Sequence, residues 1–470
     1  MAFKSGDLNE LLQTADCQMQ TARCLLRTFC CKFAVQSRTA DLVNFEKHVL
    51  ENGLVVLIHQ DTNTPLATTN LLYKIGSRDE SPDKTGFAHL FEHLMFGGSK
   101  HAESYDDIIQ LAGGDSNAYT NADITNFYCT LPAINLDTAL WLEADRMRYL
   151  NVNQKSLSTQ QQVVTEEYKE TCINQPYGMV WHMLSDLCYK VHPYRWPTIG
   201  KKIEHIAEAR LEDVQQFYNS FYGPNNAILS IAGPMKPSDV LEMVKLRFGS
   251  IPARTIDRRP RTEESIQLDA RTLTDEGKYP SSVLYLAWLM DGRSGPDYYA
   301  FDLLSDVMSL GRSSIFYQRM VKVLKVCAHM DAYITGSEDK GLFILELRPA
   351  KGISMEDMET HLWDELAVLQ REEIQASILE KLKIKNESTV CFSNVSASHK
   401  ATNLGYYESL GDANLINTES DRIAEVTTTD IYRVVNMLRK DNVNTMRLIG
   451  QGGGEGELVL HTEEEEDEDE

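Results

Sequence analysis

Residues 86–98 read Gly-Phe-Ala-His-Leu-Phe-Glu-His-Leu-Met-Phe-Gly-Gly. No Pro or Gly interrupts this stretch after its first residue until Gly97, so it predicts a short helix. At helical spacing His89, Glu92 and His93 project from one face, because they lie three and four residues apart. Two imidazoles one turn apart suit a tetrahedral Zn²⁺, and the carboxylate beside them can take a proton from a water that the metal activates.

A simpler explanation of these residues stays open at this point. A single His on an apolar helix face is more often a core or surface residue than a metal ligand, and short motifs also match by chance. Two His and one Glu on one face favour a metal site about as strongly as they favour that simpler explanation. The third ligand of a metal site would have to come from elsewhere in the chain.

The composition is that of an ordinary globular protein. The chain has 470 residues, 42% hydrophobic and 24% charged, which is enough for two or more domains. It contains no run of 18 apolar residues, so we expect no membrane-spanning helix. The net charge is −23, and residues 463–470 are all acidic. This balance argues against nucleic acid as the main partner, and the terminal run is typical of a solvated acidic tail.

The nine cysteines are an odd number and form no Cys-x-x-Cys pair. This pattern is typical of reduced thiols, so we expect a cytoplasmic protein, with an organellar or periplasmic location as the alternative. The segment 1–40 holds several basic side chains but no clear secretory core, and Asp7 and Glu10 argue against a transit sequence. We predict that residues 1–40 are a leader or a disordered extension.

Strands and helices are expected to alternate from residue 41 onward. The expected elements include a strand at 54–58, helices at 105–111, 136–148 and 158–171, and paired strands at 117–121 and 124–131. We expect Glu143, Asp145 and Arg146 on the polar side of the second of these helices. Ser158 is the expected N-cap of the third.

A weak internal duplication is visible after a linker at residues 249–266. Beyond it the order of strand, loop, helix, strand and helix repeats, and Gly98 matches Gly311. At the same offset His89, Glu92 and His93 align with Asp302, Ser305 and Asp306. We predict a metal-bearing α+β domain at 41–248, a homologous domain without metal at 267–452 and an acidic tail at 453–470.

Several segments, in this order, resemble the pitrilysin family of inverted zinc peptidases, which includes insulin-degrading enzyme and the mitochondrial processing peptidase. They are His89-Leu-Phe-Glu-His93, Asn117-Ala-Tyr-Thr120, Val163-Val-Thr-Glu-Glu167 and Asn174-Gln-Pro-Tyr-Gly178. The resemblance covers roughly residues 43–450 and is nearest to the short bacterial members. It implies two homologous α+β domains, each a mostly antiparallel sheet with helices packed on it, that form one half of a clamshell.

The resemblance makes His89 and His93 ligands of one Zn²⁺ per chain and Glu92 the general base. The family's third ligand is a Glu on a helix further along the chain. The candidates are Glu166, Glu167 and Glu170. Glu167 matches best, because it is the second acid of its motif and its separation from His93 in the sequence is that of the family's ligand.

Asn117, Ala118 and Tyr119 resemble the family's substrate-binding edge, where a peptide adds as an extra strand. Turn formation by Asn117 and core packing by Tyr119 explain these two residues about equally well. Both explanations stay open.

The resemblance also implies a second subunit, because the family's enzymes enclose the peptide between two such halves. Active relatives place an Arg and a Tyr, seven residues apart, opposite the zinc. Here Phe343 and Met355 stand where we would look for them, and Arg348 lies nearby without a Tyr. We therefore expect a heterodimer whose other chain supplies the pair, with a homodimer as the alternative.

Together these features predict a zinc metalloendopeptidase that hydrolyses peptides or short unfolded polypeptides in an enclosed chamber. The alternative is a non-catalytic or structural subunit of a hetero-oligomer that shares the fold. A purely structural zinc ion is a further alternative, but structural sites are typically closed and rich in Cys, and this ligand set contains none.

Overall fold

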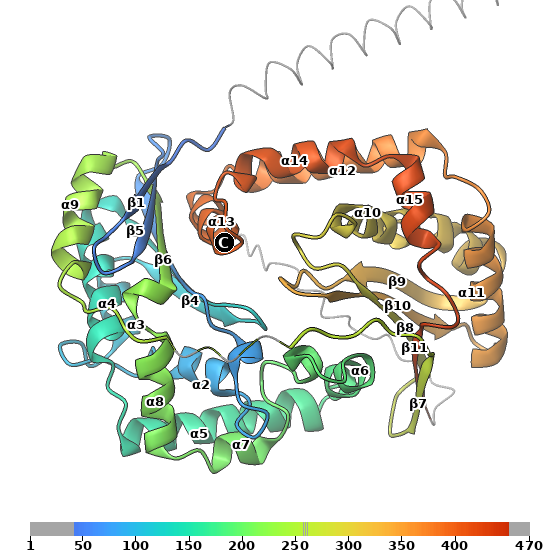
Figure 1. Cartoon of the computed structure of the whole chain (residues 1–470), viewed down its shortest axis with the longest axis horizontal. Helices are drawn as coiled ribbons and strands as arrows, with labels where there is room; N and C mark the ends of the chain where they lie inside the picture. Colours follow the sequence, from blue (N-terminus) through green and yellow to red (C-terminus); the bar gives the residue numbers. More distant parts are fainter. Residues whose placement is uncertain (1–41, 257, 259, 261, 451–470) are drawn as a thin grey trace, which may run out of the picture.

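The computed structural model describes residues 42–256, 258, 260 and 262–450. The predicted leader at 1–40 and the predicted acidic tail at 453–470 lie outside these residues. The described chain forms two sheets with helices packed against both of them (Figure 1). The predicted α+β fold of two similar halves is confirmed by the topology of these sheets.

The first sheet has six strands in the order β1-β2-β6-β3-β5-β4. They are β1 Glu46–Val49, β2 Val55–Gln60, β3 Leu66–Tyr73, β4 Asp115–Thr120, β5 Thr125–Pro132 and β6 Ala227–Gly233. The helices of this half are α2 Phe87–Leu94, α3 Tyr105–Leu111, α4 Leu136–Tyr149, α5 Gln154–Tyr168, α6 Val180–Cys188, α7 Ile203–Ala207, α8 Leu211–Phe221 and α9 Pro237–Phe248. Strands β2 and β6 are parallel, and all other neighbours are antiparallel.

The second sheet has five strands in the order β7-β11-β8-β10-β9. They are β7 Arg271–Glu276, β8 Val283–Met290, β9 Cys327–Ile334, β10 Gly341–Pro349 and β11 Asn444–Ile449. The helices are α10 Tyr298–Ser309, α11 Met355–Leu369, α12 Ala376–Ser393, α13 Ala397–Ser409, α14 Leu415–Glu425 and α15 Thr428–Val435. Strands β7 and β11 are parallel and the rest antiparallel, so this sheet repeats β2-β6-β3-β5-β4 strand for strand.

The linker predicted at 249–266 falls between α9 and β7. Helix α9 ends at Phe248 and strand β7 begins at Arg271, and the described residues between them contain no strand or helix. The predicted domain limits stay a prediction.

Both faces of the first sheet are covered. Every residue of β6 is buried, and so is every residue of β3 after Leu66. Continuous apolar strands of this kind are typical of a sheet with packing on both sides. On one face lie helices of the same half, because α2, α4 and α9 share a core with β2, β3 and β6.

The other face of the first sheet is covered by α13, a helix of the second half (Figure 1). Leu404 of α13 packs there against Leu57, Leu72 and Ile228. Gly405 allows the close approach, because a Cβ at this position would lie 2.7 Å from Asn70 Nδ2 and 2.9 Å from Ser230 Oγ.

Helix α6 of the first half covers the second sheet in return. Val180, Leu184 and Cys188 pack against a core that includes Val283 and Leu342. Since α6 follows α5 in the first half as α13 follows α12 in the second, equivalent helices have been exchanged between the two sheets.

Two local expectations are wrong. Helix α5 begins at Gln154, because the Asn153 side chain accepts hydrogen bonds from the N–H groups of Lys155 and Ser156, so Ser158 lies inside the helix and does not cap it. The expected polar side of α4 is buried, since Glu143 and Arg146 form an ion pair at 1% and 2% exposure. Burying an ion pair costs less free energy than burying either charge without its partner, because the two charges attract each other.

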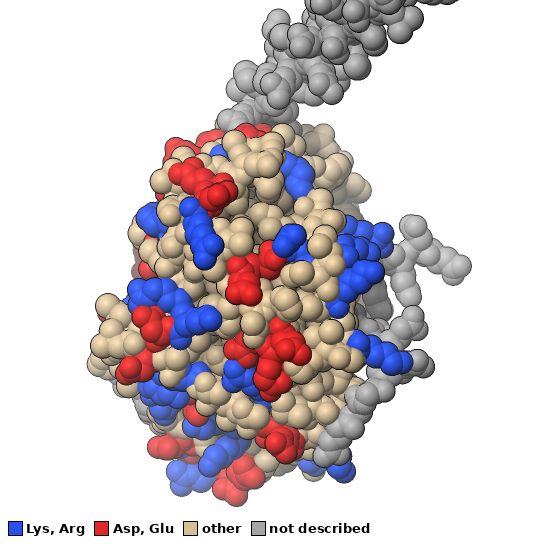
Figure 2. Space-filling model, turned by 90° about the vertical axis from the view of Figure 1, so that its right-hand side faces the viewer, with Lys and Arg blue, Asp and Glu red and all other residues tan. Residues whose placement is uncertain are grey.

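No helix within the described parts of the chain is long and apolar enough to cross a membrane. On the face that Figure 2 presents, acidic and basic side chains are interspersed, and neither kind forms a continuous patch across it.

Candidate metal centre

Helix α2 separates its apolar residues from its polar ones. Phe87, Leu90, Phe91 and Leu94 are buried in the core of the first half. This spacing leaves His89, Glu92 and His93 together on the opposite side, as the sequence predicted. The helix starts after Gly86, whose φ of +89° lies in the left-handed region.

Helix α5 brings Glu167 to this polar face. The His89 and His93 Nε2 atoms are 3.3 Å apart, and they lie 3.5 Å and 3.2 Å from the two oxygens of Glu167. One donor atom from each of these side chains falls within 4.8 Å of the others. No other group of three such side chains is this close within the residues that the structure describes.

These spacings fit a tetrahedral metal ion. Ligand atoms about 2.0–2.1 Å from a tetrahedral centre lie about 3.3–3.4 Å from one another. The separations of the two nitrogens and the Glu167 oxygens, 3.2 to 3.5 Å, are of this size. Two nitrogens and one carboxylate without Cys match the ligand set of catalytic zinc sites rather than structural ones.

The protonation of the cluster also fits a cation. Burial lowers the pKa of His89 to about 4, so its imidazole is neutral at neutral pH, as a metal ligand must be. Burial raises the pKa of Glu167, but the hydrogen bond with His93 and the electrostatic interactions with His89 and His93 outweigh it, so the net shift is downward. Neutral imidazole and carboxylate together offer lone pairs to an ion between them.

Glu92 lies beside the ligands and is held by a neighbouring strand. The Thr120 hydroxyl donates a hydrogen bond of 2.5 Å to Glu92 Oε2. Thr120 is the last residue of β4, so this bond ties the carboxylate to the end of an edge strand. The sequence did not single out Thr120 as an orienting residue.

Strand β4 carries the three residues predicted to bind substrate. It is one of the two edge strands of the first sheet, so one of its edges has no partner strand among the described residues. Asn117 and Tyr119 are exposed, whereas Ala118 between them is half-buried against the core. Asn117 lies inside β4 opposite Tyr128, so the turn that the sequence left open for it does not form, and its Oδ1 accepts the N–H of Ala118.

The two other candidate ligands point elsewhere. Glu166 is exposed and pairs with Lys169 at 2.6 Å, and Glu170 is exposed as well. Neither belongs to the cluster around His89 and His93.

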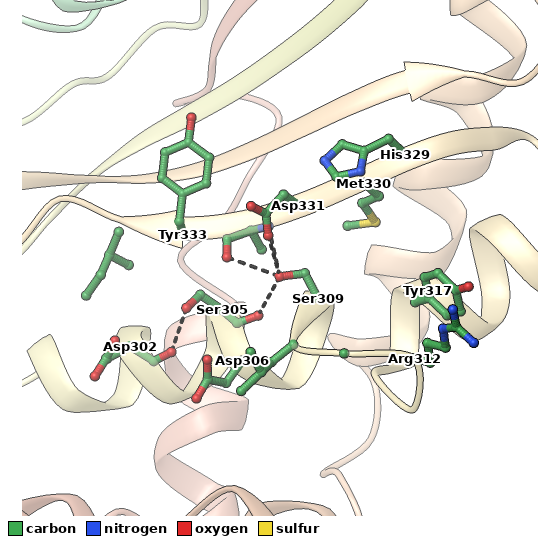
Figure 3. A pocket seen from close by; sticks show the side chains of 14 residues that line it. Asp302, Ser305, Asp306, Ser309, Arg312, Tyr317, His329, Met330, Asp331 and Tyr333 are labelled. Atoms are coloured by element: carbon green, nitrogen blue, oxygen red, sulfur yellow. Dashed lines mark hydrogen bonds between the residues drawn. The ribbon is translucent and has the colours of Figure 1, made fainter. Parts of the chain in front are cut away.

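The equivalent helix of the second half lines a cavity of ≈570 Å³ (Figure 3). Asp302, Ser305 and Asp306 of α10, aligned with the α2 cluster in the internal duplication, lie along it, with Asp331 and Tyr333 of β9 opposite. Burial and the nearby Asp302 raise the pKa of Asp306 to about 6. No imidazole occurs in α10.

Phe343 and Met355, which stand where the resemblance implies an Arg and a Tyr, are both core residues of the second half. Phe343 is buried in β10, and Met355 begins α11 in the core of the second half. Arg348 Nη2 lies 3.1 Å from Glu346 Oε1, and its guanidinium lies over the ring of Tyr177, 4.9 Å from the ring centroid.

Two family models match the chain. Residues 55–202 match the model described as Insulinase (Peptidase family M16), and residues 209–386 match the model described as Peptidase M16 inactive domain. The first match contains both imidazoles and all the acidic candidates of the cluster.

Curated relatives and solved structures are similar over most of the chain. Zinc protease PqqE of Helicobacter pylori is 29% identical over 416 residues, which cover 86% of this chain and 92% of that protein. The crystal structure of a protease from Helicobacter pylori has a TM-score of 0.80 at 28% identity and covers 87% of this chain and 100% of that one. The crystal structure of pitrilysin has a TM-score of 0.70 at 16% identity, and the match covers 87% of this chain but 45% of pitrilysin.

Proposed function

Because this chain belongs to the insulinase family of peptidases, family M16, we propose that it is a zinc metalloendopeptidase. Its substrates are peptides or short unfolded polypeptides, hydrolysed in an enclosed chamber. The observation that carries the proposal is the convergence of His89, His93 and Glu167 at 3.2 to 3.5 Å beside Glu92.

In the proposed reaction His89, His93 and Glu167 hold the metal. Zinc, when bound, supplies an open coordination position that makes water more acidic and polarises the peptide carbonyl. Glu92 accepts the proton of the attacking water on a carboxylate oxygen and later donates it to the leaving nitrogen. The hydroxyl of Thr120 keeps that carboxylate in place through its hydrogen bond.

The substrate adds to the free edge of β4 as an extra strand. Backbone groups of Asn117, Ala118 and Tyr119 supply the hydrogen bonds, which recognise an extended peptide with little regard to its side chains. The bond between Thr120 and Glu92 supports this arrangement, because it brings the general base to the end of the same strand.

The first test measures bound zinc and hydrolysis of a quenched fluorescent peptide library in one sample of purified protein. We expect about one zinc per chain and cleavage that a chelator stops and added zinc restores. If the protein binds zinc but cleaves no peptide, either alone or together with any co-purifying partner, the result would favour a non-catalytic subunit. A chain that binds no zinc would contradict the proposal.

The third ligand is tested by neutralising each candidate acid. Glu167→Gln should weaken zinc binding by more than about 100-fold, because loss of even an outer-shell partner costs 10- to 100-fold. Glu166→Gln and Glu170→Gln are matched controls on the same surface and should leave zinc affinity within about twofold. Equal losses in all three variants would exclude Glu167 as a specific ligand.

We propose that a second, homologous subunit closes the chamber. The chain spans 45% of pitrilysin, so one copy corresponds to about half of that fold. Arg348 is paired with Glu346, which favours a partner that supplies its own Arg and Tyr, hence a heterodimer. Analytical ultracentrifugation and co-purification distinguish this from a homodimer, which would be active without any other chain.

A non-catalytic subunit is the second candidate. It is favoured by the match of residues 209–386 to a model described as an inactive domain. Residues 209–386 do not include the metal cluster of His89, His93 and Glu167. The zinc and hydrolysis measurements above decide between the two candidates.

For location we propose the cytoplasm. Cys129, Cys172, Cys188 and Cys327 are buried free thiols, which suits a reducing compartment. Cell fractionation with an antibody against the chain tests this, and recovery from an oxidising compartment would contradict it.

A further inference from the structure

Glu80 is a buried carboxylate that the proposed mechanism does not use. Its side chain is 3% exposed. The N–H of Gly86 donates to Glu80 Oε2 and the N–H of Ala88 donates to Oε1, both at 2.8 Å. Burial raises the pKa of Glu80, and the backbone N–H groups of Ala88, Gly86 and Phe87 oppose this shift because they stabilise the ionised carboxylate.

These N–H groups belong to the start of α2, the helix that carries His89, Glu92 and His93. The first N–H groups of a helix have no partner within it, and a side chain at the N-cap usually accepts from them. Here the N-cap is Gly86, which has no side chain. Glu80 therefore supplies the cap from six residues upstream.

A conventional cap at position 86 would not fit. A Cβ there would lie 2.8 Å from Ile206 Cδ1 and 2.9 Å from the carbonyl oxygen of Ile199, and the positive φ favours glycine. Helix α2 is only eight residues long, and so short a helix is marginal without external support. The outside carboxylate is the support that this packing allows.

The turn that carries Glu80 is itself fixed to the rest of the first half. The N–H of Ser77 donates to the carbonyl oxygen of Asn121 at 3.2 Å, and Trp196 Nε1 donates to the carbonyl oxygen of Ser77 at 2.9 Å. Glu80 follows three residues later. These hydrogen bonds at Ser77 therefore hold the turn from which the Glu80 carboxylate reaches α2.

We propose that Glu80 is a positioning residue of the metal centre, which clamps the N-terminus of α2 and so fixes the direction in which His89 and His93 face Glu167. This proposal rests on the proposed zinc site. A shift of α2 by one residue would turn each imidazole by about 100° around the helix axis, so the start of the helix decides whether the ligands converge.

The variant that tests the clamp is Glu80→Gln, which keeps the size of the side chain but offers only one acceptor oxygen. The amide N–H₂ of the Gln would face the backbone N–H of either Gly86 or Ala88. Both groups are donors, so one of the two hydrogen bonds would be lost. We expect the Kd for zinc, measured by competition with a chromophoric chelator, to rise about 10- to 100-fold, as for other outer partners of metal ligands. The visible spectrum of the Co²⁺-loaded protein should change as well, since it reports ligand geometry.

Asp79→Asn is the matched control. Asp79 lies in the same turn and also carries a carboxylate, whose Oδ2 accepts the N–H of Gly76 at the beginning of that turn. We expect zinc affinity within about twofold of the wild type. An equal loss in both variants would mean that the turn, and not the clamp by Glu80, sets the site.

Amide hydrogen exchange of the metal-free protein gives a readout that does not depend on zinc. We expect Gly86 and Ala88 to be protected in the wild type and to exchange at least tenfold faster in Glu80→Gln. Unchanged exchange with unchanged zinc affinity would overturn the proposal. A wild type that binds no zinc would instead overturn the proposed function, while the exchange rates would still test the clamp.

If Glu80→Gln does not fold, Glu80→Asp takes its place in the same measurements. Asp keeps the charge but is one methylene shorter, so it cannot reach both N–H groups. We expect weaker zinc binding and faster exchange at Gly86 or Ala88. Wild-type behaviour of a folded Glu80→Asp would overturn the proposal.

Discussion

Helices α2 and α10 occupy equivalent places in two sheets of the same topology, yet they present opposite chemistry. On α2 two imidazoles face the carboxylate of Glu167. On α10 the aligned positions hold Asp302 and Asp306, and the cation that acts on Asp306 is Lys385 of α12. One half gathers ligands for a cation, whereas in the other half Lys385 acts on Asp306 and Arg293 acts on Asp302.

This difference shows where the function of the duplicated scaffold resides. The strand order and the exchange of α6 and α13 are common to both halves. The chemistry depends on the few side chains that α2 and α10 direct away from their cores. Substitutions at equivalent places should therefore separate effects on chemistry from effects on the shared scaffold.

The largest contrast is expected at the general base. Glu92→Gln should lower kcat by about 10²- to 10⁴-fold with zinc retained, the usual contribution of a general base. Ser305→Ala, at the aligned position of α10, should leave kcat within about twofold. Steady-state hydrolysis and zinc content measured together check this, and a large loss of kcat in Ser305→Ala would break the comparison.

The exchanged helices should respond alike. Leu184→Ala in α6 and Leu404→Ala in α13 each remove a fully buried side chain, so each should lower the free energy of unfolding by about 3 kcal/mol. Urea unfolding measures the loss, and Val395→Ala, at a residue that is exposed, is the control within about 0.5 kcal/mol. A loss confined to one of the two leucines would mean that the exchange supports one sheet only.

The links between each helix and its edge strand should differ in their effect on catalysis. Thr120→Val removes the hydrogen bond to Glu92 and should lower kcat about tenfold, because hydrogen bonds to charged groups contribute about 1.5–3 kcal/mol. Ser309→Ala removes the bond from α10 to Asp331 in the second half and should not change kcat. Zinc affinity should stay constant in both variants. A drop in kcat that zinc loss explains would contradict the orienting role of Thr120.

The smallest effect concerns the carboxylate of Asp306. Its pKa is raised to about 6 from 3.8, so the native state binds the proton more tightly than the unfolded chain does. Stability is therefore lost as the pH rises from about 4 to 6, and Asp306→Asn should raise the free energy of unfolding by about 1 kcal/mol at pH 8. Urea unfolding at pH 8 and near pH 3.5 measures this, with Asp364→Asn at an exposed site as control. An equal gain at both pH values would exclude ionisation as the cause.

Much of the scaffold could be predicted from the sequence, because its signals are local. The helix at 105–111 and the pairing of 117–121 with 124–131 follow from periodicity and turn residues, and the structure has them, with slightly different strand ends, as α3, β4 and β5. The convergence of His89, His93 and Glu167 was expected only from the family resemblance, since nothing in the spacing alone tells which acid of α5 faces α2.

The features that escaped prediction depend on contacts between distant segments. Glu143 and Arg146 look like surface charges in a helical pattern, and only the pairing within the fold explains their burial. Glu80 stands in a polar loop with no motif, so its role at the start of α2 could not be read from the sequence. Asn153 was overlooked as a cap because Ser158 offered an equally good local signal.

The exchange of helices also bears on how the chain is synthesised. Strand β6 leaves the ribosome about 160 residues before α13, which at 5–20 residues per second corresponds to a delay on the order of 10–30 seconds. During this interval Leu57, Leu72 and Ile228 of the nascent first sheet lack the helix that later covers them. A chaperone that shields one face of this sheet would suit such a chain, and translation of the second half is needed before the first can finish folding.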